Sequence, residues 1–262
     1  MGIPSALLKT VRPPSTLLAF VSVLLPLLVR TNDLAWSVQK ALPFLFGSMC
    51  TFIVNALDDL EKDAINHPER PLPSGELKPA FVAVVYYCCL AAALLSIRFG
   101  VGTHPISFLY YLLLVMAISY SYVVEYLPGI KPLYVALAST GPVVVLAQFY
   151  PRETGLYPVA LAGFFFVFGR ELCKDLPDRR GDPVSVLHTF EPRQIALISG
   201  VCQATGIVLL SFQVTTAARL LDLLLMGALL VLAYVCWLRW GRLAAALGLM
   251  KGVIFLGLFY LL

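Results

Sequence analysis

Charged residues are scarce in this sequence. They make up 13% of the 262 residues, whereas 60% of the residues are hydrophobic. An ordinary soluble domain carries about 25% charged residues. A soluble core could not enclose so much apolar surface, so the excess must face lipid. The composition therefore argues against a soluble globular protein and predicts an integral membrane protein that contacts the bilayer.

Two further scarcities narrow the range of functions. The net charge is only +4, and the basic residues lie in loops beside acidic ones, not in one patch, so we expect no nucleic-acid partner. The six cysteines lie mostly inside apolar runs, and none forms a C-x-x-C pair. We therefore interpret them as small buried side chains that bind no metal.

Long apolar runs are the most abundant feature of the sequence. A transmembrane helix needs about 20 mostly apolar residues, and the runs predict about nine such helices. They cover residues 14–29, 41–60, 79–99, 105–124, 131–150, 157–177, 194–212, 218–238 and 243–261. No linker or soluble appendage separates them. The sequence therefore predicts an all-α, multi-pass membrane bundle that forms one domain over residues 1–262.

The distribution of lysine and arginine predicts the orientation of this bundle. If alternate loops are assigned to alternate sides of the membrane, most basic residues lie on the side of the N-terminus. Cytosolic loops of membrane proteins carry an excess of lysine and arginine. We therefore expect the N-terminus to be cytosolic, together with the two acidic clusters described next.

The first acidic cluster ends the second apolar run. It reads NALDDLEKD and contains Asn55, Asp59 and Asp63 at spacings i, i+4 and i+8. On a helix with 3.6 residues per turn, these three side chains share one face. The pattern predicts three oxygen-bearing side chains stacked at the end of a membrane helix.

The second acidic cluster ends the sixth apolar run. It reads GRELCKDLPDRRGD and contains Asp175, Asp178 and Asp182 at spacings i, i+3 and i+7. These also share one face if the helix persists past Pro177, and Glu171 lies one turn earlier on that face. The presence of two such clusters on the same predicted side of the membrane argues against ordinary solvated loop charges.

Stacked carboxylates at the end of an apolar helix repel one another and need a positive partner. Mg²⁺ prefers oxygen ligands and is often shared between carboxylates and substrate phosphates. Two facing clusters would thus hold Mg²⁺ ions that bridge a diphosphate and stabilise it as a leaving group. Nearby basic side chains would contact its oxygens directly; these are Lys174, Arg70, Arg179, Arg180 and, at the start of the first predicted helix, Arg12.

At these residues the chain resembles the UbiA superfamily of intramembrane prenyltransferases. NALDDLEKD is similar to the family's first motif, and AINHPERPLPSGEL is similar to the proline-rich loop that follows it. GRELCKDLPDRRGD is similar to the second motif, with Arg12-Pro13 matching near the N-terminus. The resemblance implies nine helices around a central apolar cavity. It also implies that Asn55, Asp59 and Asp63 hold one Mg²⁺, and that Asp175, Asp178 and Asp182 hold another.

The implied activity is the ionisation of an isoprenyl diphosphate and transfer of its prenyl group to a small aromatic or hydroxyl acceptor. Two positions depart from the family pattern. Ala56 stands where an aspartate is usual, and Glu125-Tyr126 stands where a basic residue often follows the Tyr-Ser pair. The second departure keeps a UbiA-type terpene cyclase open as an alternative, because a cyclase needs no acceptor. A membrane transporter and a scaffold without catalysis are the alternatives from other classes.

Overall fold

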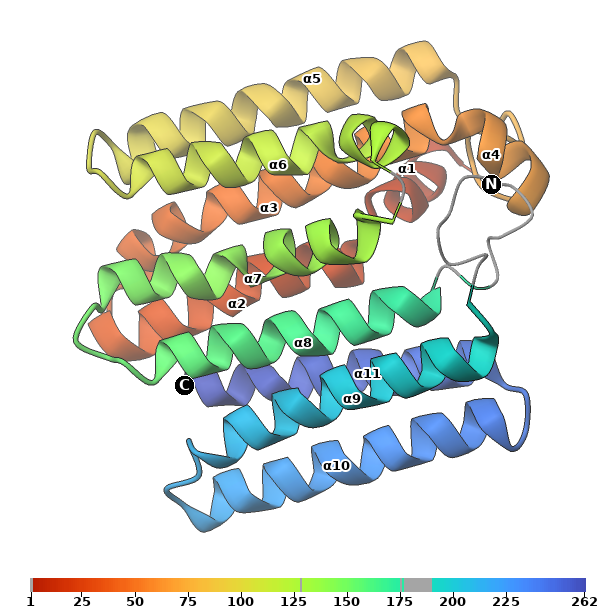
Figure 1. Cartoon of the computed structure of the whole chain (residues 1–262). Coiled ribbons are helices and arrows are strands. Elements are labelled where there is room, and N and C mark those ends of the chain that lie inside the picture. Colours follow the sequence, from red (N-terminus) through yellow and green to blue (C-terminus); the bar gives the residue numbers. More distant parts are fainter. Residues whose placement is uncertain (1, 128, 175, 177–189) are drawn as a thin grey trace. The chain divides into compact units, whose positions relative to one another are not determined.

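The computed structural model describes residues 2–127, 129–174, 176 and 190–262, and all regular elements among them are helical (Figure 1). These helices form two compact units, which divide between α6 and α7. We refer to them as the first unit (α1 to α6) and the second unit (α7 to η4).

The first unit is built around one long helix, α3, which packs against α1, α2, α5 and α6. Its elements are α1 (Ile3–Val11), α2 (Pro13–Thr31), α3 (Leu34–Asp58), α4 (Leu60–Asn66), α5 (Pro79–Leu95), the π-helix η1 (Ser96–Val101) and α6 (Ser107–Tyr126).

The second unit is built around α8, which packs against α7, α9 and α11, while α10 packs against α9 and α11. Its elements are α7 (Lys131–Phe149), α8 (Leu156–Lys174), α9 (Pro192–Ser211), α10 (Ala217–Leu238), α11 (Leu243–Gly257) and the 3₁₀-helix η4 (Leu258–Leu261).

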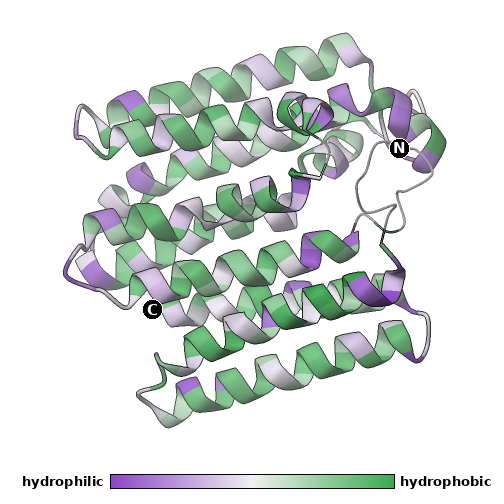
Figure 2. Cartoon of the chain, viewed as in Figure 1, coloured by the Kyte–Doolittle hydropathy of each residue, from purple (hydrophilic) through white to green (hydrophobic). Residues whose placement is uncertain are grey.

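Within the described residues, eight helices are long and apolar enough to cross a membrane, and α11 is a shorter apolar helix. The predicted all-α membrane bundle is therefore confirmed, with eight long helices and one shorter helix in place of nine similar ones. Hydrophobic residues colour most of each long helix, and hydrophilic residues are more frequent near helix ends and on α4 (Figure 2). This is the distribution that a bilayer requires, because charged groups are stable only near its surfaces.

One helix boundary and one short helix differ clearly from what hydrophobicity predicts. The second predicted helix was expected to begin at residue 41, but α3 begins at Leu34 because the Asp33 side chain accepts a hydrogen bond from the Trp36 N–H at 2.9 Å. An aspartate N-cap satisfies a backbone donor that would otherwise be left free. The short helix α1 was not predicted, since it is too short to cross a membrane.

A buried cluster in the first unit joins α1, α3, α5 and the segment between α4 and α5. Its members are Ala6, Val11, Cys50, Ile53, Leu72, Leu77, Val82 and Cys89. Leu72 and Leu77 lie in the proline-rich segment, so apolar packing attaches this segment to the helices. The polar residues beside it are thereby held at the end of α3.

In the second unit, α8 and α9 approach one another closely at Gly169. A Cβ atom placed there would lie 2.9 Å from the Ser199 carbonyl oxygen and 2.9 Å from Cγ of Gln203. The Ser199 hydroxyl also donates to the Gly169 carbonyl at 2.6 Å. Small residues allow membrane helices to pack at short range, where van der Waals contacts and hydrogen bonds between helices stabilise the pair.

We predict that Gly169→Ala destabilises the second unit by about 1–3 kcal/mol, because the added methyl group meets backbone that has no room to move. The measurement is the thermal unfolding midpoint of the purified protein in detergent. Gly227→Ala in α10 is the matched control, since its Cβ would have no neighbour within 4 Å. Equal midpoints for the two variants would contradict the close approach of α8 and α9.

Candidate functional site

The first acidic motif lies where α3 ends and α4 begins. The Asp59 N–H donates to the Asn55 carbonyl at 2.9 Å, and the Asp63 N–H donates to the Asp59 carbonyl at 2.7 Å. Asp59 itself has φ −84° and ψ 9°, so the helix is interrupted at this residue. The two hydrogen bonds keep the i to i+4 spacing across the interruption, although the sequence pattern had predicted one unbroken helix.

The three side chains of this motif have different surroundings. The Ser121 hydroxyl on α6 donates to Asn55 Oδ1 at 2.9 Å, which fixes the amide against the neighbouring helix. Asp59 is partly exposed and lies 3.9 Å from the Lys62 ammonium. Asp63 is buried, with 6% of its surface exposed. A carboxylate as deeply buried as Asp63 requires a cation or several hydrogen-bond donors.

Arg70 supplies the cation for Asp63. Its Nη1 lies 2.5 Å from Asp63 Oδ1, and the arginine side chain remains 34% exposed. Arginine presents several N–H donors in a plane, so one edge can bind a carboxylate while others remain available. Both residues were predicted as site residues, and the structure places them in direct contact.

The segment from His67 to Lys78 holds Arg70 in place. Its backbone closes on itself, since the Ser74 N–H donates to the Arg70 carbonyl at 3.0 Å and the Leu77 N–H donates to the Pro71 carbonyl at 2.9 Å. Gly75 has φ 77°, a left-handed conformation that glycine adopts without steric cost. Turn hydrogen bonds, prolines and buried leucines together restrict this segment to one conformation.

Arg12 approaches the same region from the corner between α1 and α2. Its φ is 50° and its ψ is 65°, an uncommon conformation for a residue other than glycine. The following Pro13 disfavours a helical conformation at Arg12, so the two helices separate here. Cζ of Arg12 lies 5.4 Å from the centre of the Phe52 ring, within the range of cation–π attraction.

Electrostatic interactions connect Arg12 to the acidic motif. Burial lowers the pKa of Arg12, and the like charge of Arg70 lowers it further. The carboxylates of Asp63 and Asp59 act in the opposite direction. The pKa of an arginine is so high that the side chain stays charged. Two adjacent guanidinium groups therefore favour the arrival of an anion.

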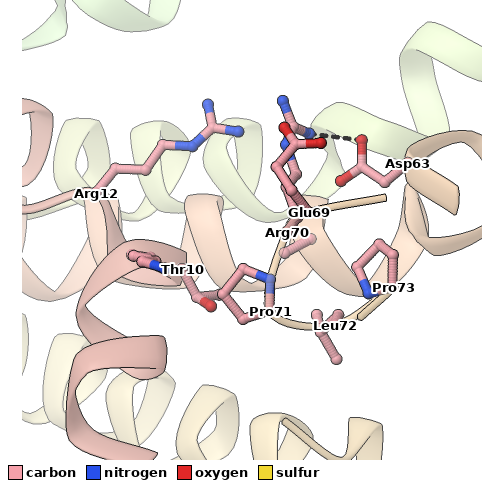
Figure 3. Close-up of a pocket in the computed structure, with 10 residues that line it drawn as sticks. Thr10, Arg12, Asp63, Glu69, Arg70, Pro71, Leu72 and Pro73 are labelled. Carbon is pink, nitrogen blue, oxygen red and sulfur yellow. Dashed lines mark hydrogen bonds and ion pairs between the residues drawn. The ribbon is translucent and has the colours of Figure 1, made fainter. Parts of the chain in front are cut away.

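Arg12, Arg70 and Asp63 line a cavity of about 270 Å³ in the first unit. Figure 3 shows the guanidinium groups of Arg12 and Arg70 on the same side of this cavity, with Asp63 paired to Arg70 and the Pro71–Pro73 segment below them. The remaining lining residues are Lys9, Thr10, Ala56 and Glu69. A backbone hydrogen bond, followed by one with His67, lowers the pKa of Glu69. The cavity thus combines three cations with two carboxylates.

The second acidic motif is described only at its start. Lys174 ends α8, and its ammonium lies 3.0 Å from Oε2 of the buried Glu171. Nη1 of Arg170 lies 2.5 Å from the other oxygen, Oε1. Glu171 therefore pairs with two cations and was not identified from sequence as their partner. Asp175, Asp178, Asp182, Arg179 and Arg180 lie outside the described residues.

The oxygen donors of the first motif match the chemistry of a hard divalent cation such as Mg²⁺. Asp59 and Asp63 offer carboxylate oxygens, and Asn55 offers an amide oxygen. The described part of the chain contains no group of three His, Cys, Asp or Glu side chains close enough to share one ion. The donor set thus fits a magnesium ion that takes further ligands from elsewhere, such as phosphate oxygens.

Ser121, Phe52, Lys9 and Thr10 belong to the site but were not predicted from the sequence. Ser121 belongs to the Tyr-Ser pair that precedes Glu125. Its contact with Asn55 joins residues 66 positions apart, and no local spacing rule encodes such a pair. Phe52 lies one turn before Ala56 on α3, so its place on the cavity-facing side follows from helix geometry once Arg12 is located.

We predict that Arg70→Met destabilises the first unit by about 1–3 kcal/mol, because Asp63 then remains buried without a partner. The double variant Asp63→Asn, Arg70→Met should recover part of this loss, since it removes both charges. Lys62→Met is the control, because exposed ion pairs contribute at most about 1 kcal/mol. The measurement is thermal unfolding in detergent; strictly additive effects of the two substitutions would contradict the pairing.

Several proteins of known name are similar to this chain in sequence. A digeranylgeranylglyceryl phosphate synthase of Methanosphaera stadtmanae is 30% identical over 194 residues, which cover 70% of this chain and 66% of that protein. A second such synthase, from Pyrococcus horikoshii, is 29% identical over 68% of this chain and 65% of its own length. A probable homogentisate phytyltransferase of Oryza sativa is 28% identical over 68% of this chain and 49% of its own length. The chain thus spans about two thirds of the first two relatives and about half of the third.

Solved structures share the fold at low sequence identity. A UbiA homologue from Aeropyrum pernix superposes with a TM-score of 0.72 at 17% identity, covering 98% of this chain and 96% of that one. A structure described as digeranylgeranylglyceryl phosphate synthase gives a TM-score of 0.67 at 17% identity, over 97% and 96% of the two chains. The model of the UbiA prenyltransferase family matches residues 16–260. This chain is an integral, multi-pass membrane protein and belongs to the UbiA prenyltransferase family.

Proposed function

We propose that this protein is a magnesium-dependent intramembrane prenyltransferase that ionises an isoprenyl diphosphate and transfers the prenyl group to a small acceptor. The observation that carries the proposal is the cavity in the first unit, where Arg12 and Arg70 lie beside Asp63. This arrangement stands at the end of a membrane helix, so a ligand there would have its charged group in the cavity and an apolar chain along the helices.

The basic and the acidic residues around this cavity have separate roles in the proposal. Arg12 and Arg70 bind oxygens of the diphosphate, since guanidinium groups form strong charge-assisted hydrogen bonds with phosphate. Asp59, Asp63 and Asn55 hold a magnesium ion between the chain and the diphosphate. The bound ion supplies positive charge that stabilises the diphosphate as it leaves.

We assign the second motif a corresponding role toward the diphosphate. Asp175, Asp178 and Asp182 hold a second magnesium ion, and Lys174 and Arg179 contact phosphate oxygens. Lys174 is the described member of this group, and its ammonium is fixed at the end of α8 by Glu171. A fixed cation stabilises a developing negative charge better than a mobile one, because no reorganisation is needed during the reaction.

The names of the relatives support transfer to an acceptor. Two are digeranylgeranylglyceryl phosphate synthases and one is a probable homogentisate phytyltransferase, so we propose a hydroxyl or an aromatic carbon as the acceptor. The UbiA-type terpene cyclase and the transporter become outcomes of the experiment below. We further propose that the N-terminus and both acidic motifs are cytosolic, in accordance with the distribution of basic residues.

We predict that Asp59→Asn lowers magnesium-dependent release of pyrophosphate from geranylgeranyl or farnesyl diphosphate by about 100-fold or more, because the metal loses a charged ligand. Asp58→Asn is the matched control, since Asp58 is exposed and lies one residue away. It should retain activity within about threefold. The assay uses purified protein with and without candidate acceptors. A chelator should stop turnover in the unmodified protein and in Asp58→Asn.

The products separate the alternatives. A prenylated acceptor supports the proposal. A cyclic hydrocarbon or terpene alcohol formed without acceptor would make the protein a cyclase. Undiminished turnover in Asp59→Asn would refute the metal assignment. Absence of turnover with every donor and acceptor, together with specific uptake of a solute into proteoliposomes, would favour the transporter.

A further inference from the structure

Glu171 is acidic, but its surroundings differ from those of a metal ligand. It lies near the end of α8, only 3% of its surface is exposed, and each of its carboxylate oxygens already contacts a cation. Oε1 lies 2.5 Å from Nη1 of Arg170, and Oε2 lies 3.0 Å from Nζ of Lys174. The charge of a carboxylate that pairs with two cations is already compensated, so a metal ion would add little further stabilisation.

The two cations are more accessible than the carboxylate between them. The side chains of Arg170 and Lys174 are 20% and 35% exposed, whereas that of Glu171 is 4% exposed. A third cation, Lys131 at the start of α7, also acts on the Glu171 carboxylate electrostatically. α7 and α8 pack together as consecutive antiparallel helices (Figure 1), so their start and end lie at the same end of the pair. Positive charge therefore exceeds negative charge in this contact set.

The helical turn before this cluster is fixed against its neighbours. The Ser199 hydroxyl is hydrogen-bonded to the Gly169 carbonyl at 2.6 Å and to the Tyr234 hydroxyl at 2.7 Å. This chain of polar groups joins α8 to α9 and α10. These hydrogen bonds hold the backbone of α8 just before the cluster, and the ion pairs with Glu171 then orient the side chains of Arg170 and Lys174.

We propose that Glu171 is a positioning residue that holds Arg170 and Lys174 as two cationic contacts for the diphosphate, and that Arg170 joins Lys174 as a direct ligand of it. This inference rests on the proposed function, since the ligand is the diphosphate of the same site. Without Glu171, the two like charges would repel each other, and their long side chains would occupy many conformations. A substitution at Glu171 should therefore weaken diphosphate binding even though it removes a negative charge.

The test measures the affinity of the full-length protein in detergent for inorganic pyrophosphate in the presence of Mg²⁺. Glu171→Gln keeps the shape of the side chain but turns an amide N–H₂ group toward one of the two cations. We expect about tenfold weaker binding, which corresponds to the loss of one charge-assisted contact. Asp222→Asn is the matched control, since it also replaces a carboxylate with an amide. Asp222 lies near the start of α10, at the end of the α9–α10 pair that is opposite to the start of α9. The affinity of this variant for pyrophosphate should stay within about twofold of the unmodified protein.

Coupling to Lys174 separates positioning from a structural effect. In a protein that already carries Lys174→Met, Glu171→Gln should weaken pyrophosphate binding by less than about twofold, because the lysine that Glu171 positions is no longer present. A purely structural role would give the full tenfold loss in both backgrounds. If Glu171→Gln does not fold, Glu171→Asp takes its place, because it keeps the charge but is too short to reach both cations. We expect it to weaken binding several-fold.

Several results would overturn the inference: unchanged or tighter binding in Glu171→Gln, full additivity with Lys174→Met, or no binding of pyrophosphate by the unmodified protein. Failure of the proposed function gives a different result. A protein whose affinity for pyrophosphate depends on Glu171, but which never turns over a prenyl diphosphate, would refute the prenyltransferase proposal and leave the role of Glu171 intact.

Discussion

The pairing of buried carboxylates with cations at the ends of membrane helices is the constraint on which the polar cluster of each unit depends. Asp63 and Glu171 are the two most buried acidic side chains in the described part of the chain. An uncompensated charge in such surroundings costs several kcal/mol, whereas a pair with good geometry is tolerated. Each of these acids is in contact with a cation. Asp63 pairs with Arg70, and Glu171 pairs with Arg170 and Lys174.

The rest of each unit can be understood as the support for these pairs. In the first unit, Leu72 and Leu77 attach the proline-rich segment to the apolar cluster, and this anchors Arg70 close to Asp63. In the second unit, the absence of a side chain at Gly169 lets α8 and α9 meet, and the Ser199 hydroxyl fixes their relative position. Apolar packing and small residues decide where the backbone lies; the ion pairs then decide where the charges lie.

Features with a local cause could be predicted from the sequence. The long apolar runs predicted the membrane helices, because their period and length follow directly from the bilayer. The spacing of Asn55, Asp59 and Asp63 predicted a common face, and hydrogen bonds across Asp59 preserve that spacing. Features that depend on distant contacts could not be predicted. The Ser121 hydroxyl that fixes Asn55 comes from another helix, and the guanidinium group of Arg12 lies over the Phe52 ring, which is 40 positions away on α3.

Glu171 shows a different limit of reading residues from sequence. Its spacing in the sequence puts it on the predicted helix face of Asp175, Asp178 and Asp182, so spacing alone groups it with the aspartates that were predicted to bind a metal. Its neighbours at i−1 and i+3 are basic, and in an apolar environment that is the stronger signal, since a buried acid beside two cations is a counter-ion. Residue type shows that a side chain can bind a metal; the charges within reach decide whether it does.

The pairing also constrains how the proposed ligands bind. Asp63 has one oxygen in contact with Arg70, so a magnesium ion on its other oxygen would lie close to a guanidinium group and be repelled by it. A diphosphate would offset this repulsion, because its negative oxygens would attract both the ion and Arg70. On the proposed function, metal and diphosphate would therefore strengthen one another's binding. The buried Asp63 already has a cation in contact, since Arg70 compensates its charge without any ligand.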